Sequence, residues 1–143
     1  MIYKNAPKNF SPKFSVVSCY VEHEGEILLL HRHDHKSEGG RWGVPAGKID
    51  QGENELEAMI REIKEETGQK VLAKELEYLS KVYVKYPDYH FIYHMFRVKL
   101  DKKTDVTLSA SEHKDYKWVA PQDALNLELV RELDRCLKMS YLL

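Results

Sequence analysis

Clustered and alternating apolar residues divide the chain into short strands separated by polar turns. Residues 14–21 are rich in β-branched and aromatic types, which predicts a strand. A polar turn leads into a second predicted strand at residues 26–31, so we expect a hairpin. Residues 76–86 and 91–100 predict two further strands, joined by a turn that contains proline and aspartate. The strands of this chain are therefore expected to be linked mostly by hairpins.

Helical periodicity appears in three places. The longest predicted helix runs from about residue 53 to residue 67, and Gly68 is well placed as its C-cap. Pro121 begins a short helix, because proline is favoured in a first helical turn. A final amphipathic helix is predicted over residues 127–141.

The remaining segments predict loops and short strands. Pro45 excludes a central strand at residues 44–47, which favours a short edge strand or a turn. Residues 107–114 predict a loop, and residues 116–119 a short strand. Hairpin-linked strands with two or three helices indicate an α/β fold, with a mixed sheet and helices packed on its faces. The length fits a single domain covering residues 1–143.

Composition and charge limit which classes of protein this chain can belong to. The chain is 43% hydrophobic and 31% charged with a formal charge of −1, so we expect a globular protein that does not bind nucleic acid. We find no apolar run long enough for a membrane span and no signal peptide. Cys19 and Cys136 are far apart, so a disulfide framework is not expected. A cytoplasmic location is the resulting prediction.

The predicted helix at residues 53–67 carries an acidic stripe separate from its apolar one. Glu62, Glu65 and Glu66 stand at positions i, i+3 and i+4, so their carboxylates converge. Each exposed like-charge pair costs roughly 0.2–0.5 kcal/mol. A hard cation with oxygen ligands, such as Mg²⁺ or Mn²⁺, would relieve this repulsion. Taken alone, an acidic stripe of this kind is more often a solvated helix face, with Arg61 pairing at i±4.

The spacing around this helix resembles the Nudix box. That signature is Gly, five residues, Glu, seven residues, then Arg-Glu-apolar-x-Glu-Glu-x-Gly-apolar. The segment from Gly47 to Gln69 matches eight of its nine specified positions. The departure is Gln69, which stands where an apolar residue is usual and touches no proposed ligand.

The resemblance implies a Nudix-type α/β/α sandwich with a mixed sheet. It also implies hydrolysis of a nucleoside diphosphate linked to another moiety, with Mg²⁺ or Mn²⁺ as cofactor. Glu112, six residues before Trp118, resembles a glutamate on a late loop of many relatives that binds a further metal or acts as general base. A solvated loop glutamate is the alternative. The metal ligands implied are the Gly47 carbonyl and the carboxylates of Glu62, Glu65, Glu66 and Glu112.

The same resemblance gives roles for the catalytic residues. Arg61 matches a residue that orients the carboxylates, and Glu53 one that pairs with this network at the helix start. The general base is expected to be Glu62 or Glu65, and after them Glu112. The sequence does not rank these candidates further.

Substrate-binding candidates lie outside the box. Arg32 and Arg41 could bind a phosphate group, although surface arginines more often have no role in binding. Trp42 could stack on a nucleotide base or simply pack at the edge of the hydrophobic core. Tyr86 falls where dinucleoside polyphosphate enzymes of the family tend to have a tyrosine, but tyrosines crowd this region. A nucleoside triphosphate is at least as good a substrate prediction.

Two other readings remain at this point. One is a catalytically inactive Nudix-fold module that binds a nucleotide or has a regulatory role, although the box carboxylates such modules usually lose are present here. The other is an unrelated α/β protein whose acidic helix contacts a basic partner. Many relatives form dimers, so a homodimer is also an expectation.

Overall fold

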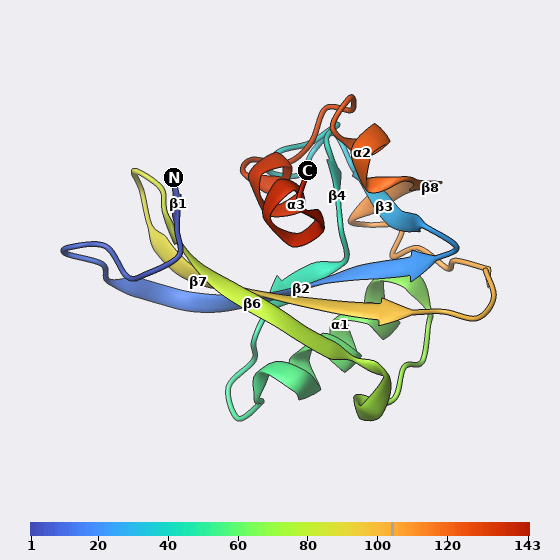
Figure 1. The fold of residues 1–143 in the computed structure, drawn as a ribbon, viewed down its shortest axis with the longest axis horizontal. Coiled ribbons are helices and arrows are strands. Elements are labelled where there is room, and N and C mark those ends of the chain that lie inside the picture. Colours follow the sequence, from blue (N-terminus) through green and yellow to red (C-terminus); the bar gives the residue numbers. More distant parts are fainter. Residues whose placement is uncertain (104) are drawn as a thin grey trace.

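The computed structural model describes residues 1–103 and 105–143 and arranges them around a mixed β-sheet (Figure 1). Its strands are β1 (Ile2–Tyr3), β2 (Pro12–His23), β3 (Glu26–Arg32), β4 (Trp42–Gly43), β5 (Ala46–Lys48), β6 (Glu77–Lys85), β7 (His90–Lys99) and β8 (His113–Val119). The helices are α1 (Glu55–Thr67), the 3-10 turn η1 (Ala73–Glu75), α2 (Pro121–Ala124) and α3 (Leu133–Tyr141).

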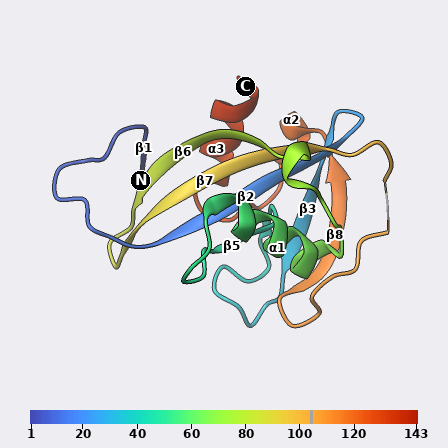
Figure 2. The same ribbon diagram turned by 90° about the horizontal axis from the view of Figure 1, so that it is seen from below.

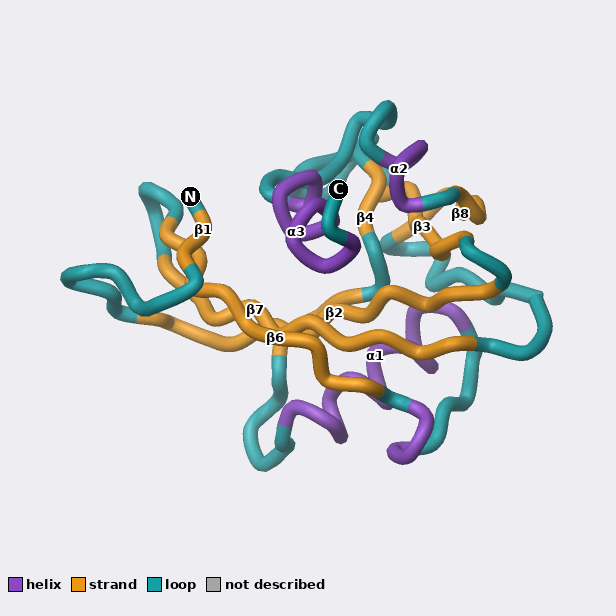
Figure 3. The backbone as a smooth tube through the Cα atoms, viewed as in Figure 1, coloured by secondary structure: helices purple, strands orange, loops and turns teal. Residues whose placement is uncertain are grey.

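The long strand β2 lies at the centre of the sheet. The strand order is β1-β6-β7-β2-β3-β4, with β5 added beside β2 and β8 beside β3. Strand β2 pairs in parallel with β7 and antiparallel with β3 and β5, which makes the sheet mixed. Figure 3 shows β2, β6 and β7 running as long neighbours, with β1 at the outer edge of the group.

Helices cover both faces of this sheet. Helix α1 lies on one face, and α2 and α3 lie on the other (Figure 1). Viewed from below, α1 crosses in front of the strands while α3 lies behind them (Figure 2). The expected α/β/α sandwich with a mixed sheet is therefore confirmed.

Alternation along β2 explains why the sheet carries a core on each face. Val17 and Val21 point to one side and belong to a buried cluster with Met59 of α1. Tyr20 points to the other side and belongs to a cluster with Leu137 of α3. A strand buried on both faces needs apolar residues at consecutive positions, as β2 has here.

Local signals fix both ends of α1. The Asn54 side chain accepts a hydrogen bond from the Glu57 backbone N–H, and the Glu57 side chain accepts one from the Asn54 N–H. This capping box contributes about 1 kcal/mol. Gly68 ends the helix with φ 78°, in the left-handed region that glycine adopts without strain. Two-ended capping sets which residues of α1 face the sheet.

The long predicted strands and the longest predicted helix are confirmed, with shifts of one or two residues at their ends. The first hairpin, the strand pair at residues 76–100 and the helix that Gly68 ends are all present. Strand β8 begins at His113, so the loop predicted over residues 107–114 ends two residues earlier than expected. It is longer than the predicted strand at 116–119 because it pairs with β3 from Ile27 to Arg32. The edge strand β1 was not predicted.

The prediction of one helix over residues 127–141 is wrong in its first part, because α3 begins only at Leu133. The Trp42 N–H donates to the Glu128 carbonyl at 2.8 Å, and the Val130 N–H donates to the Trp42 carbonyl at 2.9 Å. The backbone of residues 128–130 therefore forms hydrogen bonds with β4 instead of the internal hydrogen bonds of a helix. Glu132 then adopts φ 69°, which no helix continues through.

Two smaller expectations concern the thiols and the membrane. Cys19 and Cys136 are free and buried, as expected of ordinary packed thiols. In the described part of the chain, every helix is too short or too polar to cross a bilayer.

Candidate active site

Strand β5 lies directly against the acidic stripe of α1. A Cβ at Gly47 would overlap the Glu62 carboxyl group, so any larger residue there would displace this side chain from its present position. The Ala46 N–H donates to Glu66 Oε1 at 2.8 Å. Glu62 and Glu66 are consequently 9% and 4% exposed, whereas the Glu65 side chain is 57% exposed. The stripe predicted to lie apart from the buried face is therefore itself half buried.

Arg61 links the carboxylates at the exposed side of this stripe. Its Nε and Nη2 donate to the two carboxylate oxygens of Glu53 at 2.7 and 2.9 Å. Its Nη1 donates to Glu62 at 2.8 Å and to Glu65 at 3.3 Å. The hydrogen bonds from Arg61 hold the pKa of Glu53 below its usual value. The structure thus brings Arg61 and Glu53 together as the resemblance implied.

A second group of acids lies deeper, where α1 meets the start of β8. Ligand atoms of Glu66, Glu112 and His113 lie within 4.8 Å of one another. Burial raises the pKa of Glu66 well above its usual value, and the nearby charges of Glu62 and Glu112 raise it further. Burial also raises the pKa of Glu62, against the effect of Arg61. Within residues 1–103 and 105–143, neither Glu66 nor Glu112 has a basic partner in an ion pair.

His113 adds a neutral nitrogen to this acidic group. The residue is 4% exposed, and burial lowers its pKa to about 4, so the ring is uncharged at neutral pH. Its Nδ1 atom is buried and has no hydrogen-bond partner among the residues described here. Buried acids without basic partners, a close glycine and an unpartnered ring nitrogen together fit the residues that hold a divalent cation.

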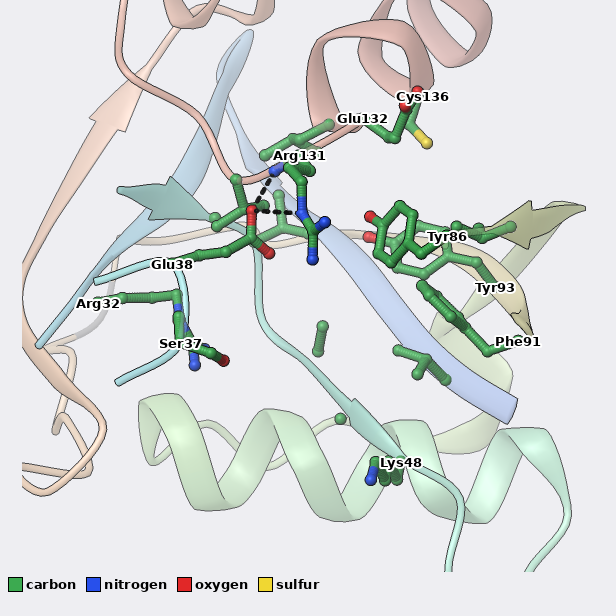
Figure 4. Close-up of a pocket in the computed structure, with 18 of the residues that line it drawn as sticks. Arg32, Ser37, Glu38, Lys48, Tyr86, Phe91, Tyr93, Arg131, Glu132 and Cys136 are labelled. Atoms are coloured by element: carbon green, nitrogen blue, oxygen red, sulfur yellow. Dashed lines mark hydrogen bonds and ion pairs between the residues drawn. The ribbon is translucent and has the colours of Figure 1, made fainter. Parts of the chain in front are cut away.

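A cavity of about 310 Å³ extends from this acidic group to an aromatic region (Figure 4). Its acidic end includes Gly47, Glu66 and His113. Figure 4 shows Glu38 and Arg131 along another side of the cavity, facing the tyrosines. The aromatic side chains that line the other end are Phe14, Tyr86, Tyr89, Phe91 and Tyr93. The cavity thus joins an acidic end to an end lined by aromatic rings.

The four predicted substrate-binding residues divide into two pairs. Arg32 and Tyr86 line the cavity. Arg41 and Trp42 lie outside its described lining: Arg41 forms an ion pair within the loop before β4, and Trp42 stacks on His31 with ring centroids 4.1 Å apart. The structure brings only the first pair to the candidate site, and a substrate contact by any of the four stays a prediction.

Sequence reasoning missed two cavity residues. His113 was not singled out, although its place directly after Glu112 was a usable signal. Arg131 lies in the segment predicted as helix, so its approach to the cavity had no signal in the local pattern. Apart from the box residues, the sequence found Arg32, Tyr86 and Glu112, and both missed residues also lie outside the box.

Comparisons with known proteins place this geometry in context. The sequence matches the NUDIX domain family over residues 12–139. It is similar to a CTP pyrophosphohydrolase of Escherichia coli (strain K12), with 28% identity over 126 residues, covering 80% of this chain and 81% of the relative. It is also similar to the asymmetrical bis(5'-nucleosyl)-tetraphosphatase of Mus musculus, with 32% identity over 121 residues, covering 79% of this chain and 76% of the relative.

A solved structure agrees with these sequence relatives. The crystal structure of a MutT protein from Methanosarcina mazei Go1 superposes with a TM-score of 0.75 and 29% identity, over 88% of this chain and 90% of that one. The match to residues 12–139 includes α1, β5, β8 and most of the cavity lining.

Proposed function

Because the chain belongs to the Nudix family and is a pyrophosphohydrolase, we propose that it cleaves the diphosphate linkage of a nucleoside triphosphate or a dinucleoside polyphosphate. The observation that carries this proposal is the cavity, which joins buried acids at one end to aromatic side chains at the other. A nucleotide has the same polarity, with a charged phosphate chain and a flat base. We also propose that residues 1–143 form a single domain.

The cation we propose is Mg²⁺ or Mn²⁺, held by the Gly47 carbonyl and the carboxylates of Glu62, Glu65, Glu66 and Glu112. Support comes from Glu66, which is buried and has no basic partner among the described residues, so its charged form would need a cation beside it. Oxygen ligands of this kind suit hard cations. When bound, such an ion neutralises charge on the diphosphate and makes water more acidic.

The side chains then have distinct tasks. Glu62 or Glu65 takes the proton of the attacking water, and Glu112 is the next candidate for this role. Glu65 is the more open to solvent, while Glu62 is held by Arg61. Arg61 and Glu53 act as positioning residues, because their contacts fix where the Glu62 and Glu65 carboxylates lie. Fixed donors and acceptors need no rearrangement during the reaction.

Substrate contacts are proposed for the two residues that reach the cavity. Arg32 is held by its Nε, which donates to the Ser37 carbonyl at 2.8 Å, and its charge suits a phosphate oxygen. Tyr86 offers a ring face at the aromatic end. The relatives named above act on a nucleoside triphosphate and on a dinucleoside tetraphosphate, which supports the two substrate classes.

A nucleotide panel tests this function. Purified protein is incubated with nucleoside triphosphates and dinucleoside polyphosphates, with Mg²⁺, with Mn²⁺ or with a chelator, and the products are identified by mass. We expect a nucleoside monophosphate among the products, released only when the ion is present. Cleavage that persists with the chelator, or products from none of these nucleotides, would contradict the proposal.

A further inference from the structure

Arg131 stands at the aromatic end of the cavity, on the chain segment that leads into α3. The centre of its guanidinium group lies 4.1 Å from the centroid of the Tyr86 ring. Figure 4 shows the guanidinium reaching into the cavity, with the Tyr86 and Tyr93 side chains facing it. Arginine stacked on an aromatic ring keeps its planar fork of N–H donors available at the edge. This fork is therefore presented to whatever occupies the aromatic end.

Glu38 fixes the position of this arginine. Its Oε1 accepts a hydrogen bond from the Arg131 backbone N–H at 2.6 Å and lies 3.5 Å from the Arg131 Nε (Figure 4). Arg41 also contacts the same oxygen, at 3.3 Å. Within the described parts of the chain, neither Nη atom of Arg131 donates a hydrogen bond. The side chain is held from one side, and its outer donors are unused.

The charges around Arg131 argue against a phosphate partner at this end. The carboxylate of Glu38 largely offsets the charge of the guanidinium, and it would repel a phosphate oxygen brought to the same place. The neighbouring walls are the rings of Tyr86, Phe91 and Tyr93, which suit a flat neutral group. A base meets both conditions, because its face stacks and its edge accepts hydrogen bonds.

We infer that Arg131, held by Glu38, reads the edge of the nucleotide base and selects bases that present two adjacent acceptors. This inference rests on the proposed function for its ligand, a nucleotide. Guanine offers O6 and N7 as such a pair, and arginine contacts them with two N–H groups. Cytosine offers O2 and N3. In the corresponding positions, adenine and uracil have a hydrogen-bond donor next to each acceptor on the ring edge. Only one of the two guanidinium N–H groups would then find an acceptor.

The test is equilibrium binding of nucleoside monophosphates, combined with turnover of the triphosphates. Calorimetry on the metal-free protein compares GMP and CMP with AMP and UMP, and kcat/KM is measured for GTP, CTP, ATP and UTP. The variant Arg131→Lys keeps the charge but loses the two-pronged geometry. The matched control is Arg135→Lys, four residues on and outside the described cavity lining.

We expect guanine and cytosine nucleotides to bind about tenfold to a hundredfold more tightly than adenine and uracil nucleotides, as for one two-pronged arginine contact. Arg131→Lys should abolish this preference, and Arg135→Lys should keep it. The inference is overturned if wild-type protein has no such preference, or if Arg131→Lys weakens all four monophosphates equally, as loss of a phosphate contact would.

Binding and turnover separate this inference from the function on which it rests. If no triphosphate is cleaved but the monophosphates show the Arg131-dependent preference, the proposed function fails and the role of Arg131 stands. If cleavage depends on Mg²⁺ but base preference is absent, the role of Arg131 fails and the proposed function stands.

Discussion

The two ends of the cavity are built in opposite ways. At the acidic end, the buried Glu66 lies next to Glu62 and Glu112 and has no basic partner among the described residues, and its pKa is raised. The aromatic end carries one arginine whose charge is offset by Glu38. Apolar burial stabilises the second end, whereas burial of like charges costs stability at the first. The acidic end lowers stability, so a function such as cation binding is needed to explain why these acids lie together.

This contrast also separates chemistry from recognition. Changes at the acidic end should lower kcat, because the groups there act on the reacting atoms. Changes at the aromatic end should raise KM and leave kcat nearly unchanged, because that end binds the part of the nucleotide that does not react. The following predictions test this division, from the largest expected effect to the smallest.

Glu65→Gln should lower kcat by about a hundredfold or more, the usual contribution of a general base. The side chain is 57% exposed, so the variant should fold normally. Steady-state kinetics with Mg²⁺ measures the effect, and circular dichroism checks the fold. Near-normal turnover would remove Glu65 from the catalytic residues and leave Glu62 and Glu112 as candidates.

Glu53→Gln should lower kcat about tenfold to a hundredfold, as for residues that orient metal-binding carboxylates. The change removes the charge that pairs with Arg61 through two hydrogen bonds. KM for the nucleotide should stay within about twofold, and circular dichroism should report an unchanged fold. An unchanged kcat, or a loss that follows the fraction of unfolded protein, would show that Glu53 has no positioning role.

Tyr86→Leu should raise KM about tenfold, because stacking on an aromatic ring contributes roughly 1–3 kcal/mol per base. Leucine keeps the site apolar but removes the ring on which Arg131 also rests. A matched control is Tyr78→Leu, at an exposed position outside the described cavity lining. A fall in kcat with KM unchanged would place Tyr86 with the chemical step and break the comparison.

Arg32→Gln and Arg41→Gln form the smallest contrast. Arg32 lines the cavity, so its loss should raise KM about fivefold, as for one hydrogen bond to a charged group. Arg41 lies outside the lining and pairs with Glu38, so its loss should change KM by less than about threefold. Equal effects of the two variants would show that the cavity is entered from the side of Arg41.

The extent of the sequence predictions follows the same division. The acidic end was predictable because Glu53, Arg61, Glu62 and Glu66 lie within one helix and its entry, where spacing alone decides which side chains meet. The capping residues Asn54 and Gly68 lie in the same stretch. Local rules therefore predicted the helix and which of its side chains meet, whereas the roles of these residues were implied by the resemblance to the Nudix box.

The aromatic end was not predictable from local rules. Its residues come from β2, from the hairpin of β6 and β7 and from the segment before α3, which meet only in the folded chain. The amphipathic pattern of residues 127–141 suggested a continuous helix. Pairing of Glu128 and Val130 with Trp42 overrides that pattern and turns Arg131 toward the cavity.

The central claim, that the acidic end binds a divalent cation, is tested most directly by titrating Mn²⁺ into metal-free protein and following the free ion by electron paramagnetic resonance. We predict saturable binding to the wild type, a weakening of about tenfold or more in Glu66→Gln, and unchanged binding in Tyr86→Leu. Equal binding by wild type and Glu66→Gln, or no binding to the wild type, would contradict the account.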